Sequence, residues 1–284
     1  MLIKNNDSAL YCESAIRPKK SLGQNFLTDK NALTKIVNLC EIQPQEVVLE
    51  IGSGTGLLTE KLLPKVSKLY AVEIDNSLFQ RLVAKFAASL AAEPGKLVLI
   101  NDDILKLDFN RLDAEKMRII ANVPYYISTK IIKKVIDNLT KIEDVILLLQ
   151  KEFGEKLMAK PKNKNYTSLT LFVNYFFEVK KLMEVKNTCF CPKPKVDSVL
   201  VRLIPRKKPL FQVQEDDFFN LIRSCFHLRR KFLLNSLAKS PYLKLTPGYK
   251  EIDFFKRNDK IRAEELALAD YYQLYLGIKE FILG

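Results

Sequence analysis

The feature that most constrains this chain is a glycine-rich turn between an apolar run and a helix. Glu46–Ile51 is a short run of β-branched and aliphatic residues, typical of a buried parallel strand. Glycines then occupy every second position, Gly52, Gly54 and Gly56, and leucines at helical spacing follow. Because glycine has no Cβ, such a turn lets the backbone approach a ligand closely. The segment therefore predicts a strand, a ligand-binding turn and a helix.

A second predicted strand, Leu69–Asp75, ends in acidic residues about 20 residues beyond Gly52. An acid at this offset is placed to accept hydrogen bonds from the two ribose hydroxyls of a cofactor. We expect Glu73 to do so. The alternative is a glycine turn with a purely structural role, which the surrounding strands, helix and acid disfavour.

The spacing of the glycines bears on the identity of the cofactor. The dinucleotide fingerprint is G-x-G-x-x-G, whereas this chain has G-x-G-x-G with Glu50 ahead of it. The pyrophosphate of NAD prefers a helix N-terminus free of carboxylates. The cationic sulfonium and ammonium groups of S-adenosylmethionine tolerate an acidic neighbour. The pattern thus favours S-adenosylmethionine, and an NAD-dependent oxidoreductase is the weaker alternative.

An acidic pair, Asp102 and Asp103, ends a third predicted strand, Leu97–Asn101. The carboxylate of Asp103 can contact the adenine amine of the cofactor. It can also cap the N-terminus of a helix. Both interpretations stay open from the residues alone.

A second motif, Asn122-Val-Pro-Tyr125, follows the predicted strand Met117–Ala121 at the edge where open α/β sheets place their ligands. An adenine amine is a poor nucleophile because its lone pair is delocalised into the ring. If the Asn122 side-chain oxygen and the Val123 carbonyl accept its two N–H bonds, the lone pair can turn toward a methyl group. The proline fixes φ and removes a competing donor, and Tyr125 can stack on the base, which contributes about 1–3 kcal/mol.

The two motifs together indicate methyl transfer from S-adenosylmethionine to the N6 of an adenine. Displacement at the sulfonium methyl needs alignment more than a strong base, because the proton can leave after the transfer. The alternative for Asn122–Tyr125 is an ordinary proline-tyrosine turn. Its place beside the glycine motif disfavours that alternative.

With these motifs the sequence resembles the ribosomal RNA small-subunit adenine N6-dimethyltransferases, the bacterial KsgA enzymes and their eukaryotic counterparts. The resemblance extends over nearly the whole chain, and five blocks carry it in the order of the family. These are Lys19-Lys-Ser-Leu-Gly-Gln-Asn-Phe-Leu27, Asn122-Val-Pro-Tyr125, Phe190-Cys-Pro-Lys-Pro-Lys-Val-Asp-Ser198, Arg229-Arg-Lys231 with Asn235-Ser-Leu237, and Arg262-Ala-Glu-Glu-Leu266.

The resemblance implies an α/β fold: a doubly wound, Rossmann-like class I S-adenosylmethionine-dependent methyltransferase domain with a small C-terminal all-α domain. It also implies a set of cofactor-binding residues. These are Asn25, Leu27, Gly52, Glu73, Asp103 and Asn122. Among them, Asn25 and Leu27 would fold over the cofactor, Glu73 would take the ribose and Asp103 would read the adenine.

The resemblance further implies three catalytic residues, Asn122, Tyr125 and Phe190. Asn122 would sit between the cofactor and the target amine. Phe190 would close the face of the flipped base opposite Tyr125. From the residues alone, core packing before a proline turn is the alternative for Phe190.

The net charge of +13 over 284 residues fits a polyanionic partner. The basic residues include four clusters, each of which could alone be a solvated face. They are Arg17, Lys19 and Lys20; Lys160, Lys162 and Lys164; Arg206, Lys207 and Lys208; and Arg229, Arg230 and Lys231. Beside an adenine site they favour RNA, and the resemblance implies small-subunit rRNA and the assembling small ribosomal subunit as partners. Membrane binding is disfavoured, because no long uncharged apolar stretch is present.

The rare residue types limit other chemistry. A single histidine, His227, disfavours a histidine-centred triad or a multi-histidine zinc site. The five cysteines are scattered, and Cys189-Phe-Cys191 lacks metal-ligand spacing, so we expect no metal. An odd cysteine count without a signal peptide predicts reduced thiols and a cytoplasmic protein, which we expect to be a monomer.

We predict three parts: an N-terminal arm over residues 1–28, an S-adenosylmethionine-binding methyltransferase domain over residues 29–205, and a C-terminal helical RNA-binding domain over residues 206–284. Strand and helix patterns alternate in the second part, and helical patterns fill the third. Further predicted elements are helices Ser77–Ala92 and Ser128–Leu139, strand Val145–Gln150, the antiparallel pair Glu178–Val185 and Val196–Ile204, and helices Asp216–His227, Arg229–Ala238 and Ala263–Phe281.

By resemblance, the enzyme would dimethylate two adjacent adenosines in a hairpin loop near the 3′ end of small-subunit (16S) rRNA during ribosome biogenesis. A loop suits the physics, because unstacked bases are extruded at low cost. The related large-subunit enzymes of macrolide resistance are the nearest rival, and Lys195–Ser198 with Arg262–Leu266 favours the small-subunit family. A DNA adenine methyltransferase is disfavoured, because those enzymes usually carry proline at the position of Val123. A ribosome-assembly factor with secondary catalysis is the alternative from a different class.

Overall fold

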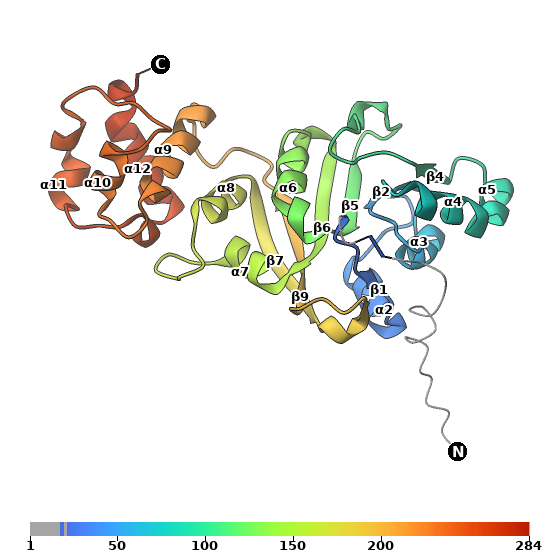
Figure 1. Cartoon of the computed structure of the whole chain (residues 1–284). Helices are drawn as coiled ribbons and strands as arrows, with labels where there is room; N and C mark the ends of the chain where they lie inside the picture. Colours follow the sequence, from blue (N-terminus) through green and yellow to red (C-terminus); the bar gives the residue numbers. More distant parts are fainter. Residues whose placement is uncertain (1–17, 20–21, 284) are drawn as a thin grey trace. The chain divides into compact units, whose positions relative to one another are not determined.

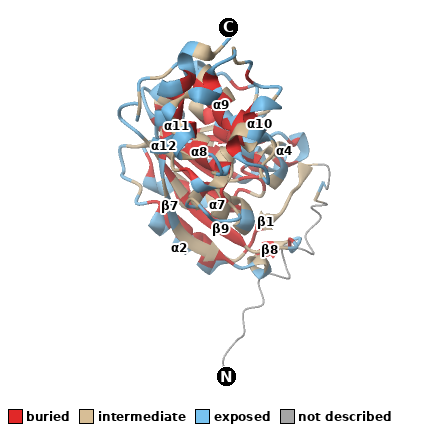
Figure 2. Ribbon diagram, turned by 90° about the vertical axis from the view of Figure 1, so that its left-hand side faces the viewer, coloured by how far each residue is buried: buried red, intermediate tan, exposed pale blue. Residues whose placement is uncertain are grey.

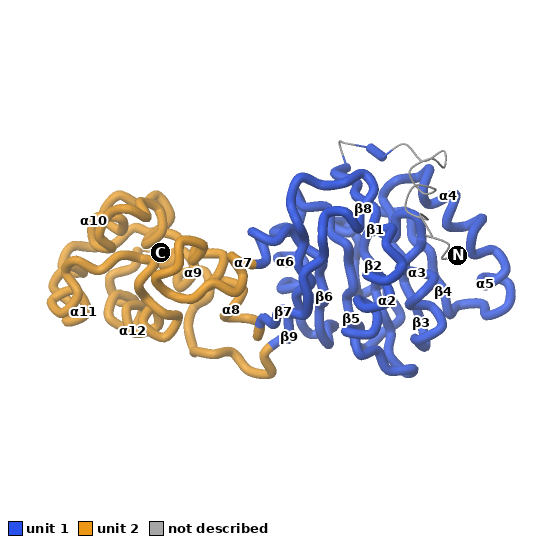
Figure 3. Tube along the Cα trace, turned by 90° about the horizontal axis from the view of Figure 1, so that it is seen from below, with its two compact units in different colours: residues 1–154, 179–205 blue, residues 155–178, 206–284 orange. Residues whose placement is uncertain are grey.

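A computed structural model of the chain describes residues 18–19 and 22–283. The contacts divide the chain into two compact units, residues 1–154 with 179–205 and residues 155–178 with 206–284 (Figure 3). Residues 155–178 therefore cluster with the C-terminal unit, which differs from the single boundary expected near residue 205. Most of the predicted arm, including Arg17 and Lys20, lies outside the described residues. The RNA-binding role of the C-terminal part stays a prediction.

The first unit is built on a mixed sheet whose seven described strands run in the order β4-β3-β2-β5-β6-β9-β7 (Figure 1). The strands are β2 (Val47–Ile51), β3 (Lys68–Val72), β4 (Leu97–Ile100), β5 (Met117–Asn122), β6 (Ile142–Gln150), β7 (Phe177–Val185) and β9 (Ser198–Pro205). Strands β2 to β6 pair in parallel, and β9 is antiparallel to β6. The predicted strands are confirmed, with the two late ones at one edge of the sheet.

The chain reverses its direction across this sheet after β4. From β2 to β4 it moves toward one edge, and from β5 to β6 toward the other. Because parallel crossovers are right-handed, α3 and α4 cover one face and α6 covers the opposite face. The helices that begin in this unit are α2 (Lys30–Leu39), α3 (Leu57–Leu62), α4 (Asn76–Lys85), α5 (Ala87–Ala92), α6 (Ser128–Ile136) and α7 (Lys151–Met158). This is the doubly wound arrangement that the sequence predicts.

The prediction of one continuous helix over Ser77–Ala92 is wrong. Phe86 leaves the helical conformation, with φ −102° and ψ 13°, and separates α4 from α5. Its ring is buried and packs against the glycine turn. A Cβ placed on Gly56 would lie only 2.9 Å from Phe86 Cε2. Packing in the core thus interrupts a helical pattern that the periodicity alone would continue.

Apolar side chains on the strands form the core of the first unit, and Figure 2 shows the buried residues following the strands. Residues Val145 to Leu149 of β6 are all buried, as expected for a strand that is covered on both faces. On one face they continue into a cluster with α2 and α3. A separate antiparallel pair, β1 (Phe26–Leu27) with β8 (Phe190–Cys191), adds Leu27 and Phe190 to this cluster.

The second unit is helical and has its own apolar core, which confirms the predicted small all-α part. Its helices are α8 (Ser168–Phe176), α9 (Glu215–His227), α10 (Leu233–Ala238), α11 (Asp253–Arg257) and α12 (Leu268–Ile278). The fully buried rings of Phe218 and Tyr271 lie in this core. The predicted helix Arg229–Ala238 begins only at Leu233, because the Leu233 amide donates instead to the Ile261 carbonyl at 2.8 Å.

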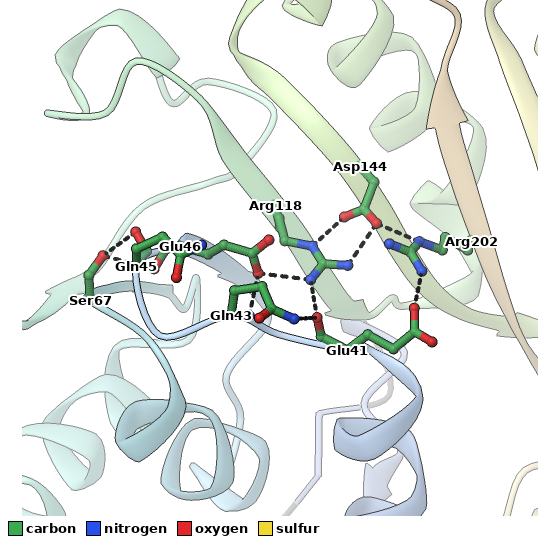
Figure 4. Close-up of polar contacts among 8 residues, drawn as sticks. All are labelled: Glu41, Gln43, Gln45, Glu46, Ser67, Arg118, Asp144 and Arg202. Carbon is green, nitrogen blue, oxygen red and sulfur yellow. Dashed lines mark hydrogen bonds and ion pairs between the residues drawn. The ribbon is translucent and has the colours of Figure 1, made fainter.

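The amino end of the sheet carries a buried ion-pair network (Figure 4). Arg118 of β5 donates from Nε and Nη2 to both carboxylate oxygens of Asp144, at 2.6 and 2.8 Å. Its Nη1 reaches Glu46 at 2.8 Å, while Arg202 of β9 contacts Asp144 and also Glu41. Burial disfavours the charge of Arg118, but pairing with Asp144 and Glu46 raises its pKa on balance. The charges at this end of the sheet satisfy one another.

The cysteines depart in part from expectation. Cys40, Cys189 and Cys225 carry free thiols, whereas Cys191 is disulfide-bonded. The expectation of reduced thiols is therefore wrong for Cys191. Among the described residues, no helix is long and apolar enough to span a membrane.

Candidate functional site

A cavity of about 270 Å³ opens at the carboxyl ends of β2, β3, β4 and β5, where the chain reverses direction across the sheet. Open α/β sheets bind their ligands at this switch point. The cavity is lined by residues 22–26, the glycine turn, the end of β3, residues 102–105 and residues 122–127, with Lys130. Six of the predicted site residues meet here. They are Asn25, Gly52, Glu73, Asp103, Asn122 and Tyr125.

The glycine turn after β2 has the conformation that its sequence predicts. Gly52, Gly54 and Gly56 have φ values of 74°, 56° and 73°, a region that other residues rarely adopt. A Cβ on Gly54 would lie 3.1 Å from the Phe26 ring, whereas a Cβ on Gly52 would meet only the Asn122 carbonyl, at 3.8 Å. The absence of a Cβ on Gly54 thus lets Phe26 of β1 pack against the turn, and the absence of a Cβ on Gly52 leaves the backbone exposed at the cavity wall.

The Glu73 carboxylate is fixed at the cavity wall by backbone amides. Its Oε2 accepts from the Gly54 amide and its Oε1 from the Asp75 amide, each at 2.8 Å. Burial raises the pKa of Glu73, and these two hydrogen bonds partly oppose that rise. Because each carboxylate oxygen can accept more than one hydrogen bond, Glu73 keeps acceptor capacity for a ligand.

Glu50 lies close to the turn but does not line the cavity. Its side chain is buried and accepts from the Thr59 hydroxyl at 2.6 Å. Burial raises the pKa of Glu50 to about 7. Glu50 therefore stands behind the turn, bonded to α3, and its charge is not presented to a ligand through the cavity wall.

Asp103 caps a turn and not a helix, and its contact with the cofactor stays a prediction. Its Oδ1 accepts from the Leu105 amide at 2.9 Å, so the side chain caps the turn that follows β4. The same residue lines the cavity. Its second oxygen is available to a donor, because no hydrogen bond within the described residues engages it.

The N-terminal segment is tied to the sheet through Asp75, which sequence reasoning passed over. Lys19 Nζ and Gln24 Nε2 donate to its two carboxylate oxygens at 2.8 and 3.1 Å. Burial opposes the charge, but the hydrogen bonds from Lys19 and Gln24 lower the pKa of Asp75 below its ordinary value. Asp75 also caps α4 through the Ser77 amide. The sequence signal that could have pointed to Asp75 is its place two residues after Glu73, at the end of the same predicted strand.

The Asn122 amide at the end of β5 has a defined orientation. Its Nδ2 donates to the Asn25 carbonyl at 3.1 Å, and Asn25 Nδ2 donates to the Gly23 carbonyl at 3.1 Å. The Asn122 oxygen is consequently left as an acceptor in a residue that lines the cavity. The backbone joins in this fixation, since the Val123 amide donates to the Leu148 carbonyl of β6 at 3.4 Å.

Tyr125 is anchored by a partner that the sequence did not reveal. Its hydroxyl and the Ser198 hydroxyl of β9 share a hydrogen bond of 2.9 Å. Burial raises the pKa of Tyr125, and the bond to Ser198 partly opposes that rise, so the phenol is neutral at physiological pH. Ser198 closes the Phe190–Ser198 block, the one signal that could have pointed to it. The bond holds the ring of Tyr125 at the cavity wall.

Leu27 and Phe190 are not brought to the cavity. They face each other across the β1–β8 pair and are 7% and 4% exposed, in the core of the first unit. The position of Phe190 matches the core-packing alternative. The cofactor role of Leu27 and the base-closing role of Phe190 stay predictions. Among the described residues, no group of three or more His, Cys, Asp or Glu side chains is placed to hold a metal ion.

The glycine turn, the acid of the next strand and the Asn122–Tyr125 motif at the switch point define a Rossmann-like methyltransferase. The family model for ribosomal RNA adenine dimethylases matches residues 15–280. The chain is 40% identical over 261 residues to ribosomal RNA small subunit methyltransferase A of Clostridium acetobutylicum, which covers 91% of this chain and 92% of that protein. The chain belongs to the ribosomal RNA adenine dimethylase family, as the resemblance predicted.

Two solved structures share the fold. A dimethyladenosine transferase from Plasmodium falciparum is 30% identical, with a TM-score of 0.75 over 91% of this chain and all (100%) of that one. The 23S rRNA methyltransferase ErmE is 25% identical, with a TM-score of 0.66 over 89% of this chain and 99% of that one. These likenesses confirm the predicted fold class.

Proposed function

We propose that this chain transfers methyl groups from S-adenosylmethionine to the N6 atoms of two adjacent adenosines in small-subunit (16S) rRNA. The adenosines would lie in a hairpin loop near the 3′ end, and the product would be N6,N6-dimethyladenosine. Family membership and the likeness to a small subunit methyltransferase A support the reaction and the substrate. The observation that carries the proposal is the Asn122 amide, whose nitrogen is engaged by Asn25 while its oxygen remains an acceptor at the cavity.

The residues of the cavity fit S-adenosylmethionine. When bound, this cofactor supplies an electrophilic methyl group on a sulfonium centre. Glu73 would accept from the ribose hydroxyls with the lone pairs that Gly54 and Asp75 leave free. Asp103 would accept from the adenine amine with its unengaged oxygen. Gly52 would allow close approach, since only one atom lies within 4 Å of a Cβ placed there.

The target amine would be activated by position. The Asn122 oxygen and the Val123 carbonyl would accept its two N–H bonds and turn its lone pair toward the methyl group. Tyr125 would hold the base by stacking, a contact that contributes about 1–3 kcal/mol. The hydroxyl bond to Ser198 fixes that ring before the base arrives. The proton can pass to water after the transfer, so alignment is the main contribution of the protein.

RNA binding would draw on the basic surface of the second unit, which holds three of the four clusters. The side chains of two clusters are exposed. They are Lys160, Lys162 and Lys164, and Arg206, Lys207 and Lys208. Arg229 is instead paired with Glu264, which leaves Arg230 and Lys231 of that cluster exposed. We propose that residues 206–284 contact the rRNA of the assembling subunit and that the protein acts as a monomer.

Methyl transfer from labelled S-adenosylmethionine to undermethylated small subunits, large subunits and naked RNA tests this proposal. The labelled nucleoside is then identified by chromatography. We expect N6,N6-dimethyladenosine in small-subunit RNA alone. Label in the large subunit would contradict the substrate assignment, and the absence of label with cofactor binding intact would contradict the reaction.

A further inference from the structure

Two exposed side chains at the rim of the cavity take no part in the chemistry above. Tyr126 directly follows Tyr125 in the 3₁₀ turn Tyr125–Ile127 and is 59% exposed, although it lines the cavity. Lys130 lies one turn later in α6, lines the same cavity and is exposed. Tyr126 therefore places an exposed aromatic ring beside the cavity.

The ring of Tyr126 is held in place along one edge. Gly23 has φ 58°, and a Cβ placed on it would lie 3.1 Å from Tyr126 Cδ1 and 3.3 Å from Cε1. The Gly23 backbone therefore packs against this edge as only a glycine can, and Asn25 Nδ2 holds the Gly23 carbonyl at 3.1 Å. The ring thus packs against the backbone along one edge and stays open to solvent elsewhere. A ring whose motion such a contact restricts loses less entropy when a base stacks on it.

Lys130 adds a charge of the right sign beside this ring. No ion pair within the described residues neutralises its ammonium group, whereas Lys133 in the next turn lies 3.5 Å from Asp137. An ammonium group on a flexible stem binds phosphate as a point charge. The rim thus offers a flat apolar face and a cation within one turn of chain. A single-stranded nucleotide presents the complementary pair, a base and a phosphate.

We propose that Tyr126 and Lys130 form a subsite for the nucleotide next to the target adenosine. The neighbouring base stacks on the Tyr126 ring, and a phosphate of the same strand contacts Lys130. This inference rests on the proposed function, in which each of two adjacent adenosines enters the cavity in turn. The neighbouring base stays joined through the RNA backbone to the base in the cavity, so we expect it to lie at the rim. Because every base has a π face, the subsite accepts different bases.

The test combines changes in the protein with changes in the RNA. Tyr126→Ala and Tyr126→Phe are compared on substrates in which one of the two adjacent adenosines is kept, replaced by guanosine or made abasic. We expect Tyr126→Ala to raise KM for the intact RNA about tenfold, the scale of one lost stacking contact. Tyr126→Phe keeps the ring and should stay within about twofold of the parent protein. The Kd for S-adenosylmethionine should not change.

The abasic substrates make the test specific. With the neighbouring base removed, the parent protein should lose about the same tenfold, and Tyr126→Ala should lose nothing further. Guanosine at that position should be accepted nearly as well as adenosine. Tyr242→Ala is the matched control, because Tyr242 is 49% exposed in the other unit. Its effect on KM should be the same with and without the neighbouring base.

The phosphate contact has its own measurement. Lys130→Gln should lower the slope of log affinity against log salt by about 0.7, the value for one phosphate of a single strand. Lys133→Gln on the same helix, 71% exposed at its side chain, should leave that slope unchanged. Equal slopes for Lys130→Gln and the parent protein would overturn this half of the proposal.

Two results would overturn the stacking half. One is additive losses from Tyr126→Ala and from the abasic neighbour, since independent effects mean that ring and base do not touch. The other is weaker S-adenosylmethionine binding in Tyr126→Ala, which would assign the ring to the cofactor. Both differ from a failure of the proposed function, in which the parent protein would not methylate intact small-subunit RNA at all.

Discussion

The two ends of β5 hold their polar groups in different ways. At the amino end, Arg118 is bound on two sides by Asp144 and Glu46, and Arg202 closes the network (Figure 4). At the carboxyl end, Asn122 is held by the Asn25 backbone and keeps an unengaged oxygen. Charges that satisfy one another stabilise a fold, whereas groups oriented by the backbone keep capacity for a ligand. This difference separates the structural end of the sheet from the functional one.

The largest expected effect breaks the structural end. Asp144→Ala leaves two buried or half-buried guanidinium groups without their shared carboxylate, so the free energy of unfolding should fall by about 3–5 kcal/mol. The rate of methyl transfer per folded molecule should change little. Denaturant unfolding and single-turnover transfer measure the two quantities.

Asp113→Ala is the matched control, because Asp113 also pairs with a cation, Lys68, but its side chain is 95% exposed. Its loss should be below about 1 kcal/mol. A loss for Asp144→Ala as small as that control would show that the amino-end network does not stabilise the sheet.

The next effect breaks the functional end. Glu73→Gln replaces one carboxylate oxygen with an NH2 group, which is a donor. That position can then accept neither from the backbone amide of Gly54 or Asp75 nor from a ribose hydroxyl. Loss of a charged hydrogen bond corresponds to about 1.5–3 kcal/mol, so the Kd for S-adenosylmethionine should rise about 10- to 100-fold. Isothermal titration calorimetry measures the Kd, and an unchanged value would remove Glu73 from the cofactor site.

A third prediction contrasts Glu50, a buried acid behind the glycine turn, with the ion-paired acids at the amino end of the sheet. The pKa of Glu50 is about 7 in the folded chain against an ordinary value of 4.5, so the folded state binds this proton more tightly than the unfolded state. The contribution of Glu50 to the free energy of unfolding therefore falls as pH rises from about 4.5 to about 7. Glu50→Gln should exceed the parent protein in unfolding free energy at pH 8, by on the order of 1–3 kcal/mol.

The gain from Glu50→Gln should shrink toward pH 5, where the parent side chain is protonated in the folded state. Unfolding curves at both pH values check this, with Glu60→Gln on the exposed side of α3 as control. A gain independent of pH would mean that titration of Glu50 is not the cause.

The smallest effect concerns the anchor of Tyr125. Tyr125→Phe keeps the stacking ring and removes the hydroxyl bond to Ser198. One hydrogen bond contributes about 0.5–1.5 kcal/mol, so the fall in kcat should be about 2- to 10-fold. Ser198→Ala should reproduce it, and the double variant should add little. Additive losses in the double variant would show that the two hydroxyls act independently.

Local patterns predicted the parts of the site that depend on local geometry. The glycine turn, the position of Glu73 and the placement of Asn122 follow from strands that end at one edge of a parallel sheet. The sequence did not predict pairings between distant residues, such as Lys19 with Asp75 or Tyr125 with Ser198. Those depend on tertiary packing, which periodicity does not record.

The same limit explains the errors in the fold. Helix Ser77–Ala92 looks continuous by spacing, but Phe86 turns into the core beside Gly56. Residues 155–178 carry helical patterns that do not show which core they join, and they cluster with the C-terminal helices. Leu27 and Phe190 were assigned by resemblance; they pair in the β1–β8 ladder and do not line the cavity, and their roles stay predictions.

The most direct test of the central claim is the product formed by Asn122→Ala on undermethylated small subunits. The nucleoside at the two adjacent adenosines is identified by mass spectrometry, and binding to the subunit is measured in parallel. Our account predicts that binding persists while N6,N6-dimethyladenosine is lost, with a rate at least about 100-fold below that of the parent protein. Dimethyladenosine formed at a near-normal rate would contradict it.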